Sequence, residues 1–186
     1  MNRVKYFEKE ISYIRDESKK RDIGILIDLL PDYFFSIPMS SDDSDCPKYG
    51  LTKNGLVKYT KVAVRMAMDM FDTVNNFSDN DRDLIIMAIL MHDGMKNGEI
   101  DSGEVCIEHS LLVSELIMKN VSKLEMDVDD VRKMCMMIES HMGKVENSNV
   151  NLPVPVNEIQ RYVYRCCYLA SRKYLNVRFN KLEILE

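Results

Sequence analysis

LIIMAILMHDGMKNG, residues Leu84–Gly98, joins a long apolar run to an abruptly polar ending. The first eight residues, Leu84–Met91, are all apolar, which predicts a helix that is buried on every side. The run ends in an imidazole beside a carboxylate, His92-Asp93, followed by two glycines and a lysine. A buried helix gains nothing in packing from this pair, and a desolvated carboxylate is costly without a compensating cation. We therefore expect His92 and Asp93 to face a positive charge.

The composition around this segment is that of an ordinary globular protein. The chain has 186 residues, of which 46% are hydrophobic and 30% charged, enough for one well-buried domain. No apolar stretch approaches the roughly 20 residues of a membrane span, and the charged start MNRVKYFEKE does not resemble a signal peptide. The expected location is therefore the cytosol, and no membrane partner is expected.

Charge and cysteine usage exclude further classes of protein. A net charge of -5 argues against extensive nucleic-acid binding, although it permits a small phosphorylated ligand held by local cations. The five cysteines are odd in number and lack CxxC spacing. Neither a disulfide framework nor a zinc knuckle is therefore predicted.

Helical periodicity dominates the chain, and it predicts an all-α bundle. Ser78-x-x-Asp81 is expected to cap the helix that ends near Asp93. Residues 1–30 are predicted to form an N-terminal helical extension packed on the core, and residues 31–186 a single helical domain. The other expected helices cover Val4–Lys19, Ile23–Leu30, Leu56–Asn75, Glu104–Val121, Val128–Met142 and Asn157–Asn176, with Pro31–Asn54 irregular.

The three histidines, His92, His109 and His141, each lie on the apolar face of a different predicted helix. A single inward-facing histidine is usually a hydrogen-bonded core residue, but three of three is harder to explain by packing. Facing helices of a bundle often build a metal site from such residues. A divalent ion would compensate Asp93 and use the imidazole lone pairs, and it could activate water for hydrolysis.

Six collinear segments of this chain resemble the HD-domain superfamily of metal-dependent phosphohydrolases, especially a subgroup common in bacteria and phages. The similar segments are LPDYFFSIPMS, GLVKYTKVAV, AILMHDGMKNG, EHSLLVSELI, IESHMGKV and YLASRKYL. The resemblance covers about residues 30–175. It implies an HD-like helical fold, hydrolysis of phosphate esters that are often nucleotides, and the cytoplasm of a bacterial or phage-infected cell.

The resemblance also assigns roles to individual residues. His92 and Asp93 match the metal-binding pair, and His109 and His141 match the later histidine ligands. Lys96 matches a lysine that contacts the substrate phosphate, so Asp93 and Lys96 are the expected catalytic residues. Arg172 matches a second substrate-binding cation.

Three positions depart from the family pattern. Tyr59 replaces a histidine ligand, Cys167 replaces an aspartate ligand, and Cys46 replaces a histidine of the subgroup. Cys167 is either a soft metal ligand or a small buried residue. Tyr59 is expected to fill the volume of the lost imidazole, to hydrogen-bond Asp93 or a water molecule, and to border the substrate. The remaining donors suit one divalent transition-metal ion (Fe, Mn, Zn, Ni or Co), or none if the site is degenerate.

Three hypotheses about function therefore stay open at this point. The first is a metal-dependent phosphohydrolase that acts on a nucleotide or a related phosphomonoester. The second is an inactive relative that binds a nucleotide or signalling ligand without cleaving it. The third is a module that binds a protein partner. Self-association into a homo-oligomer is compatible with each hypothesis.

Overall fold

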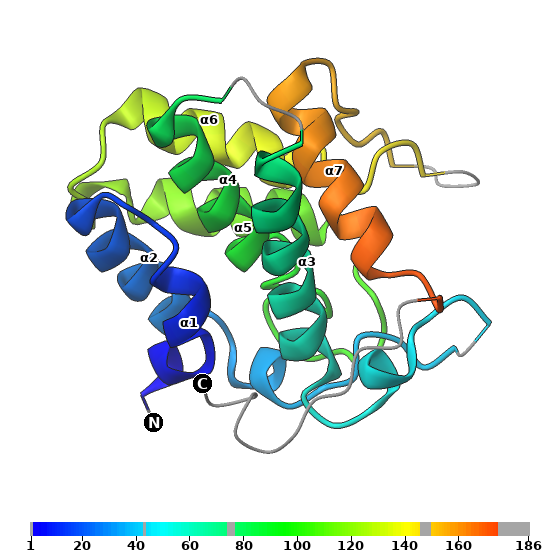
Figure 1. Ribbon diagram of the computed structural model, residues 1–186. Helices are drawn as coiled ribbons and strands as arrows, with labels where there is room; N and C mark the ends of the chain where they lie inside the picture. The colour runs from blue at the N-terminus through cyan, green and yellow to red at the C-terminus, as the bar shows by residue number, and fades with distance from the viewer. Residues whose placement is uncertain (1, 43, 74–76, 146–149, 175–186) are drawn as a thin grey trace.

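The computed structural model describes residues 2–42, 44–73, 77–145 and 150–174, and every regular element within these ranges is helical (Figure 1). The predicted all-α fold is thus confirmed. The α-helices are α1 (Glu8–Ile11), α2 (Glu17–Leu29), α3 (Gly55–Phe71), α4 (Asp79–Met91), α5 (His109–Lys119), α6 (Val128–Glu139) and α7 (Glu158–Ala170). None of the helices in these ranges has the length and apolar character needed to cross a membrane.

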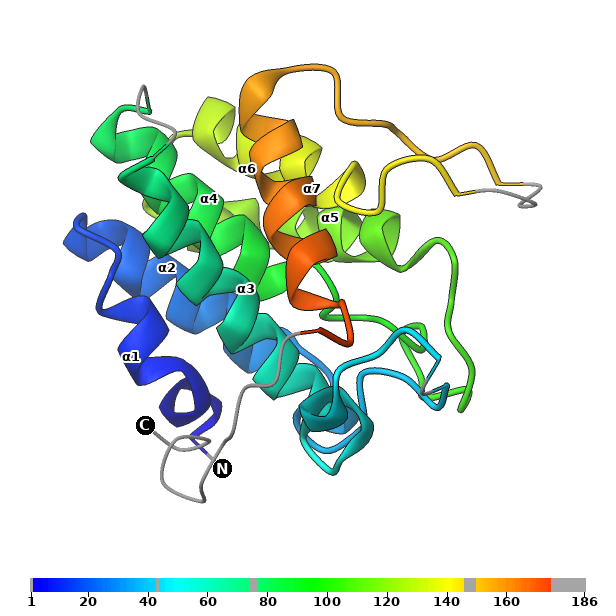
Figure 2. The same ribbon diagram turned by 45° about the vertical axis from the view of Figure 1, so that its right-hand side comes forward.

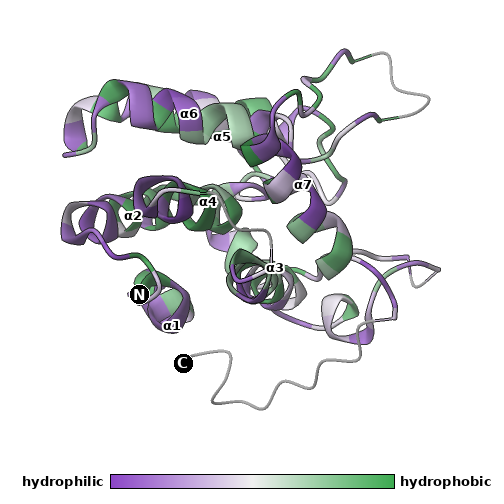
Figure 3. Ribbon diagram, turned by 45° about the horizontal axis from the view of Figure 1, so that its top comes forward, coloured by the Kyte–Doolittle hydropathy of each residue, from purple (hydrophilic) through white to green (hydrophobic). Residues whose placement is uncertain are grey.

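Helix α4 is the central element of the bundle. Helices α2, α3, α6 and α7 all pack against it, and α5 covers α6 (Figure 2). Residues 84–91 are at most 2% exposed, as the apolar run predicts. Figure 3 shows the same contrast, because α4 is largely hydrophobic whereas the outer turns of α2 and α6 are hydrophilic. The predicted cap is also confirmed, since the Ser78 hydroxyl accepts a hydrogen bond from the Asp81 backbone N–H.

The predicted helix Val4–Lys19 is wrong. The chain forms a 3₁₀ helix, η1 (Arg3–Phe7), then the single turn of α1, and it breaks before α2 begins at Glu17. The break is held from a distance, because the backbone N–H groups of Arg15 and Asp16 donate to the carboxylate of Asp83 in α4 at 2.9 Å. The expected interruption between Lys19 and Ile23 does not exist, and α2 runs through it.

Several other predicted boundaries also moved. Helix α5 begins at His109 rather than at Glu104. Residues 104–108 belong to the preceding loop, in which Cys106 N donates a hydrogen bond to the Lys96 carbonyl. Helix α6 ends at Glu139, so His141 lies in the following turn. Helix α7 ends at Ala170, and the predicted ends at Asn75 and Asn176 lie outside the described residues. The segment expected to be irregular contains two 3₁₀ helices, η2 (Asp32–Phe35) and η3 (Lys48–Leu51). A further 3₁₀ helix, η4 (Val121–Lys123), follows α5.

The N-terminal segment shares the main hydrophobic core. Phe7, Ile14 and Ile23 are at most 1% exposed and belong to the same cluster of buried side chains as α4. Within this segment α2 packs against α4 and α1 packs against α3, and Figure 1 shows these blue helices on the other side of the bundle from α7.

Candidate metal centre

The ends of three helices bring the three histidines to one place. His92 directly follows α4, His109 is the first residue of α5, and His141 lies in the turn after α6. The chain turns after Asp93 at Gly94, which lies directly against Leu30. A Cβ added to Gly94 would lie 2.5 Å from Leu30 Cδ2, so the turn has little room for a side chain at this position. Helix ends rather than helix faces therefore position these side chains.

Each imidazole is oriented by a hydrogen bond between its Nδ1 atom and the backbone carbonyl three residues earlier. The pairs are His92 with Ile89 at 2.6 Å, His109 with Cys106 at 2.6 Å and His141 with Ile138 at 2.7 Å. A carbonyl oxygen only accepts hydrogen bonds, so each Nδ1 carries the ring proton. In the neutral rings each Nε2 atom is then left with a free lone pair, as in histidine ligands of metal ions.

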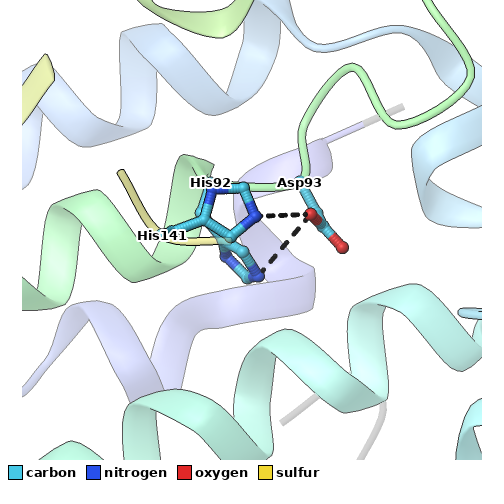
Figure 4. A group of neighbouring side chains, drawn as sticks. All are labelled: His92, Asp93 and His141. Carbon is cyan, nitrogen blue, oxygen red and sulfur yellow. Dashed lines mark ion pairs between the residues drawn. The ribbon is translucent and has the colours of Figure 1, made fainter. Parts of the chain in front are cut away.

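The three Nε2 atoms converge on one oxygen of Asp93. They lie 3.0 Å (His109), 3.2 Å (His141) and 3.8 Å (His92) from Asp93 Oδ1. Figure 4 shows the rings of His92 and His141 directed at this carboxylate. The Nε2 atoms of His109 and His141 are also only 3.4 Å apart. Lone pairs facing each other and an anion repel unless a cation or a proton lies between them.

Burial determines the protonation of the cluster. It lowers the pKa of His92 to about 3, and it lowers the pKa of His141 as well. Burial alone would raise the pKa of Asp93, but Lys96 and the surrounding imidazoles hold that pKa well below its usual value. The site therefore combines neutral imidazoles with an ionised carboxylate, which is a set of metal-ligand donors.

His92, Asp93 and His141 form a buried group that can hold a metal ion. Their ligand atoms all lie within 4.8 Å of one another. His109 lies outside this compact group, although its Nε2 atom is only 3.0 Å from Asp93 Oδ1. His92 is fully buried, and its Nε2 atom has no hydrogen-bond partner within the described ranges.

Lys96, which the sequence analysis assigned to a substrate phosphate, forms an ion pair with Asp93 in the structure. Its Nζ atom lies 2.8 Å from Asp93 Oδ2, on the other oxygen from the histidines. The loop that carries Lys96 is braced by Tyr33, whose hydroxyl accepts from Asn97 N and donates to the Gly98 carbonyl. Lys96 therefore compensates Asp93, whereas His92 Nε2 stays without a hydrogen-bond partner among the described residues.

The cluster lies at the wall of a pocket of about 500 Å³. Asp93, His109 and His141 line the pocket, together with the predicted substrate residues Lys96 and Arg172. His92 does not line it and approaches Asp93 from behind. The structure adds residues that the sequence analysis missed, of which Lys144, Tyr164 and Tyr168 are the most relevant. Of these three residues, only Lys144 had a signal in the sequence, because it lies three residues after His141.

Tyr59 and Cys167 form part of the same pocket wall. The Tyr59 hydroxyl donates to the backbone carbonyl of Cys167 at 3.1 Å rather than to Asp93, which was one of the two partners expected from the sequence. Burial raises the pKa of the Cys167 thiol well above its usual value, which favours the neutral thiol. The thiol does not belong to the compact group of three ligand residues.

Comparison of the chain with protein-family models, with curated proteins and with solved structures finds no match.

Proposed function

We propose that this protein is a metal-dependent phosphohydrolase that acts on a nucleotide or a related phosphomonoester. The observation that supports the proposal is the convergence of three imidazole Nε2 atoms on one carboxylate oxygen at the wall of a pocket. The pocket also contains Lys96 and Arg172, which suit a phosphate group.

The donor set fits a single divalent transition-metal ion. Three imidazoles and one carboxylate suit Fe, Mn, Zn, Ni or Co better than Mg, which prefers oxygen ligands. The unpartnered Nε2 atom of His92 fits the same interpretation, because a buried polar atom without a partner is costly. His92, Asp93, His109 and His141 would hold the ion.

The residues around the ion would each have a defined part in hydrolysis. A divalent ion in such a site lowers the pKa of water from about 15.7 toward about 7. Lys96 Nζ would neutralise a phosphate oxygen beside Asp93, and the Arg172 guanidinium would bind an anionic group elsewhere on the same substrate. The water oxygen forms a bond to phosphorus while the ester P–O bond breaks, which yields inorganic phosphate and an alcohol. Tyr59 and Cys167 would limit access of bulk water at the pocket wall.

Elemental analysis of the purified full chain tests the proposal. We expect close to one transition-metal ion per chain in the wild type, and its loss in His92→Ala and in His141→Ala. Cys135→Ala, a buried substitution in α6 outside the pocket, is the matched control and should retain the ion. A wild type that takes up no metal, even after reconstitution, would refute the proposal.

A second candidate function is binding of a nucleotide without cleavage. It is favoured by the ion pair between Lys96 and Asp93, which compensates the carboxylate in the absence of an ion. The two candidates differ in what happens to the ligand. Incubation of the metal-loaded protein with nucleoside monophosphates should release phosphate if the first is right, and leave them intact if the second is right.

A further inference from the structure

Three cationic side chains line the pocket, but only one of them is paired with a carboxylate. Lys96 contacts Asp93 Oδ2. Lys144 and Arg172 form no ion pair with any carboxylate in the described part of the chain. This is notable in a protein with 30 acidic and 25 basic residues. Two cations without an ion-pair partner in this part of the chain border the same pocket, which favours an anionic ligand group. Arg172 also borders a smaller hollow that is lined by Asp42 and Asp45.

Arg172 is held in place rather than free in solvent. Its guanidinium carbon lies 4.5 Å from the centre of the Tyr168 ring. Its Nε and one terminal nitrogen lie 3.1 Å and 2.9 Å from Ser171 Oγ. Stacking on an aromatic ring and a local hydrogen bond both reduce the number of conformations of the side chain.

The turn that precedes Lys144 contacts α7, the helix that also carries Tyr168. Lys144 follows Gly143, which has a φ of +66°, in the turn that carries His141. A Cβ at Gly143 would lie 2.7 Å from Tyr164 Cε2, so this turn rests directly on the Tyr164 ring. Tyr164 in turn lies beside Tyr168, with ring centres 5.9 Å apart. Tyr168 thus holds the Arg172 side chain, whereas Tyr164 supports the backbone turn that precedes the exposed Lys144.

We infer that Lys144 and Arg172 form a second phosphate subsite, and that the substrate carries two phosphate groups. The inference rests on the proposed function for the first phosphate, which would be bound beside Lys96. A phosphomonoester brings at most about two negative charges, which Lys96 and a divalent ion already match. The pocket volume of about 500 Å³ falls within the usual range for small-molecule ligands and exceeds the needs of one phosphate.

Calorimetric titration with two matched phosphonates tests the inference. Methylphosphonate has one phosphonate group, and methylenediphosphonate has two joined by a bridge that resists hydrolysis. We expect the full chain as purified to bind the diphosphonate at least about tenfold more tightly, because one added charge-assisted contact contributes roughly this much. Metal content is measured before and after each titration, which shows whether the probe has extracted an ion.

Two variants and one control test the second subsite. Lys144→Ala should weaken the diphosphonate about tenfold and leave methylphosphonate affinity nearly unchanged. Arg172→Gln should also weaken the diphosphonate. Lys173→Ala is the matched control, because Lys173 is exposed, donates to the Ser44 carbonyl and does not line the pocket. It should bind both probes as the wild type does.

The outcomes distinguish this inference from the proposed function. Equal affinity for the two probes, or wild-type behaviour of Lys144→Ala, would overturn the second subsite even if the protein binds metal and releases phosphate. A tenfold preference that depends on Lys144 in a protein without metal would support the subsite and refute the hydrolase.

Discussion

At the level of single residues, the Nε2 atom of His92 is a buried nitrogen whose environment requires a partner. The side chain is fully buried, and this nitrogen has no hydrogen-bond partner among the described residues. A buried polar atom without a partner costs about 1–3 kcal/mol. His92 also lies behind the pocket wall, so it cannot contact a substrate directly. The proposed role of His92 as a metal ligand is consistent with both observations.

Tyr168 provides a test of the pocket at the level of one side chain. Replacement by leucine should weaken methylenediphosphonate binding about two- to fivefold, because Arg172 loses the ring on which its guanidinium stacks. Tyr168→Phe keeps the ring and should bind like the wild type. Calorimetry would measure both affinities.

A positioning role requires that Tyr168 act through Arg172. In the background of Arg172→Gln, the change from tyrosine to leucine should therefore have little further effect. A loss of the same size in both backgrounds would mean that Tyr168 contacts the ligand itself.

At the level of helices, the start of α2 depends on a carboxylate at its N-terminus. The Asp16 side chain accepts hydrogen bonds from the backbone N–H groups of Ser18 and Lys19. Hydrogen bonds from the Ser18 side chain and from these backbone groups lower the pKa of Asp16 to about 2. An unfolded aspartate has a pKa near about 3.9, so the ionised cap favours the folded state.

This cap predicts a dependence of stability on pH. Because the folded pKa is lower than the unfolded one, the contribution of Asp16 should be complete above about pH 4 and lost as the pH falls toward 2. Urea unfolding of the wild type and of Asp16→Asn should differ by a constant amount at higher pH and converge in this window. A difference that persists unchanged at pH 2 would show that the charge of Asp16 does not contribute.

At the level of the whole molecule, a buried charge cluster joins the N-terminal segment to α3. Glu10 and Lys61 are both fully buried, with Lys61 Nζ 3.8 Å from Glu10 Oε2. Arg65 Nε lies 3.4 Å from the other carboxylate oxygen. Charges of this kind are costly to bury singly, so each depends on the others.

Removal of one member of this cluster should destabilise the whole fold. Glu10→Ala should lower the free energy of unfolding by about 3–5 kcal/mol, because it leaves Lys61 buried without its carboxylate. Glu8→Ala, at an exposed position two residues earlier, should change it by no more than about 0.5 kcal/mol. Urea denaturation would measure both, and equal effects of the two variants would contradict the expectation.

Local sequence signals were sufficient where a helix is defined by its own residues. The apolar run of α4 and its cap at Ser78 were predicted correctly because burial and capping follow from adjacent positions. The helix expected over Val4–Lys19 failed because Asp83, nearly seventy positions away, holds the break before α2. Periodicity contains no information about such a contact.

The sequence by itself determined that the chain is helical, that α4 is buried and is followed by a histidine and an aspartate, and that the histidines are candidate ligands. Only the tertiary structure decided that three imidazoles meet on one oxygen of Asp93, and that Lys144 joins the pocket. Helix formation and burial depend on residues within a few turns. The site depends on where separate helices end relative to one another, which packing between distant segments controls.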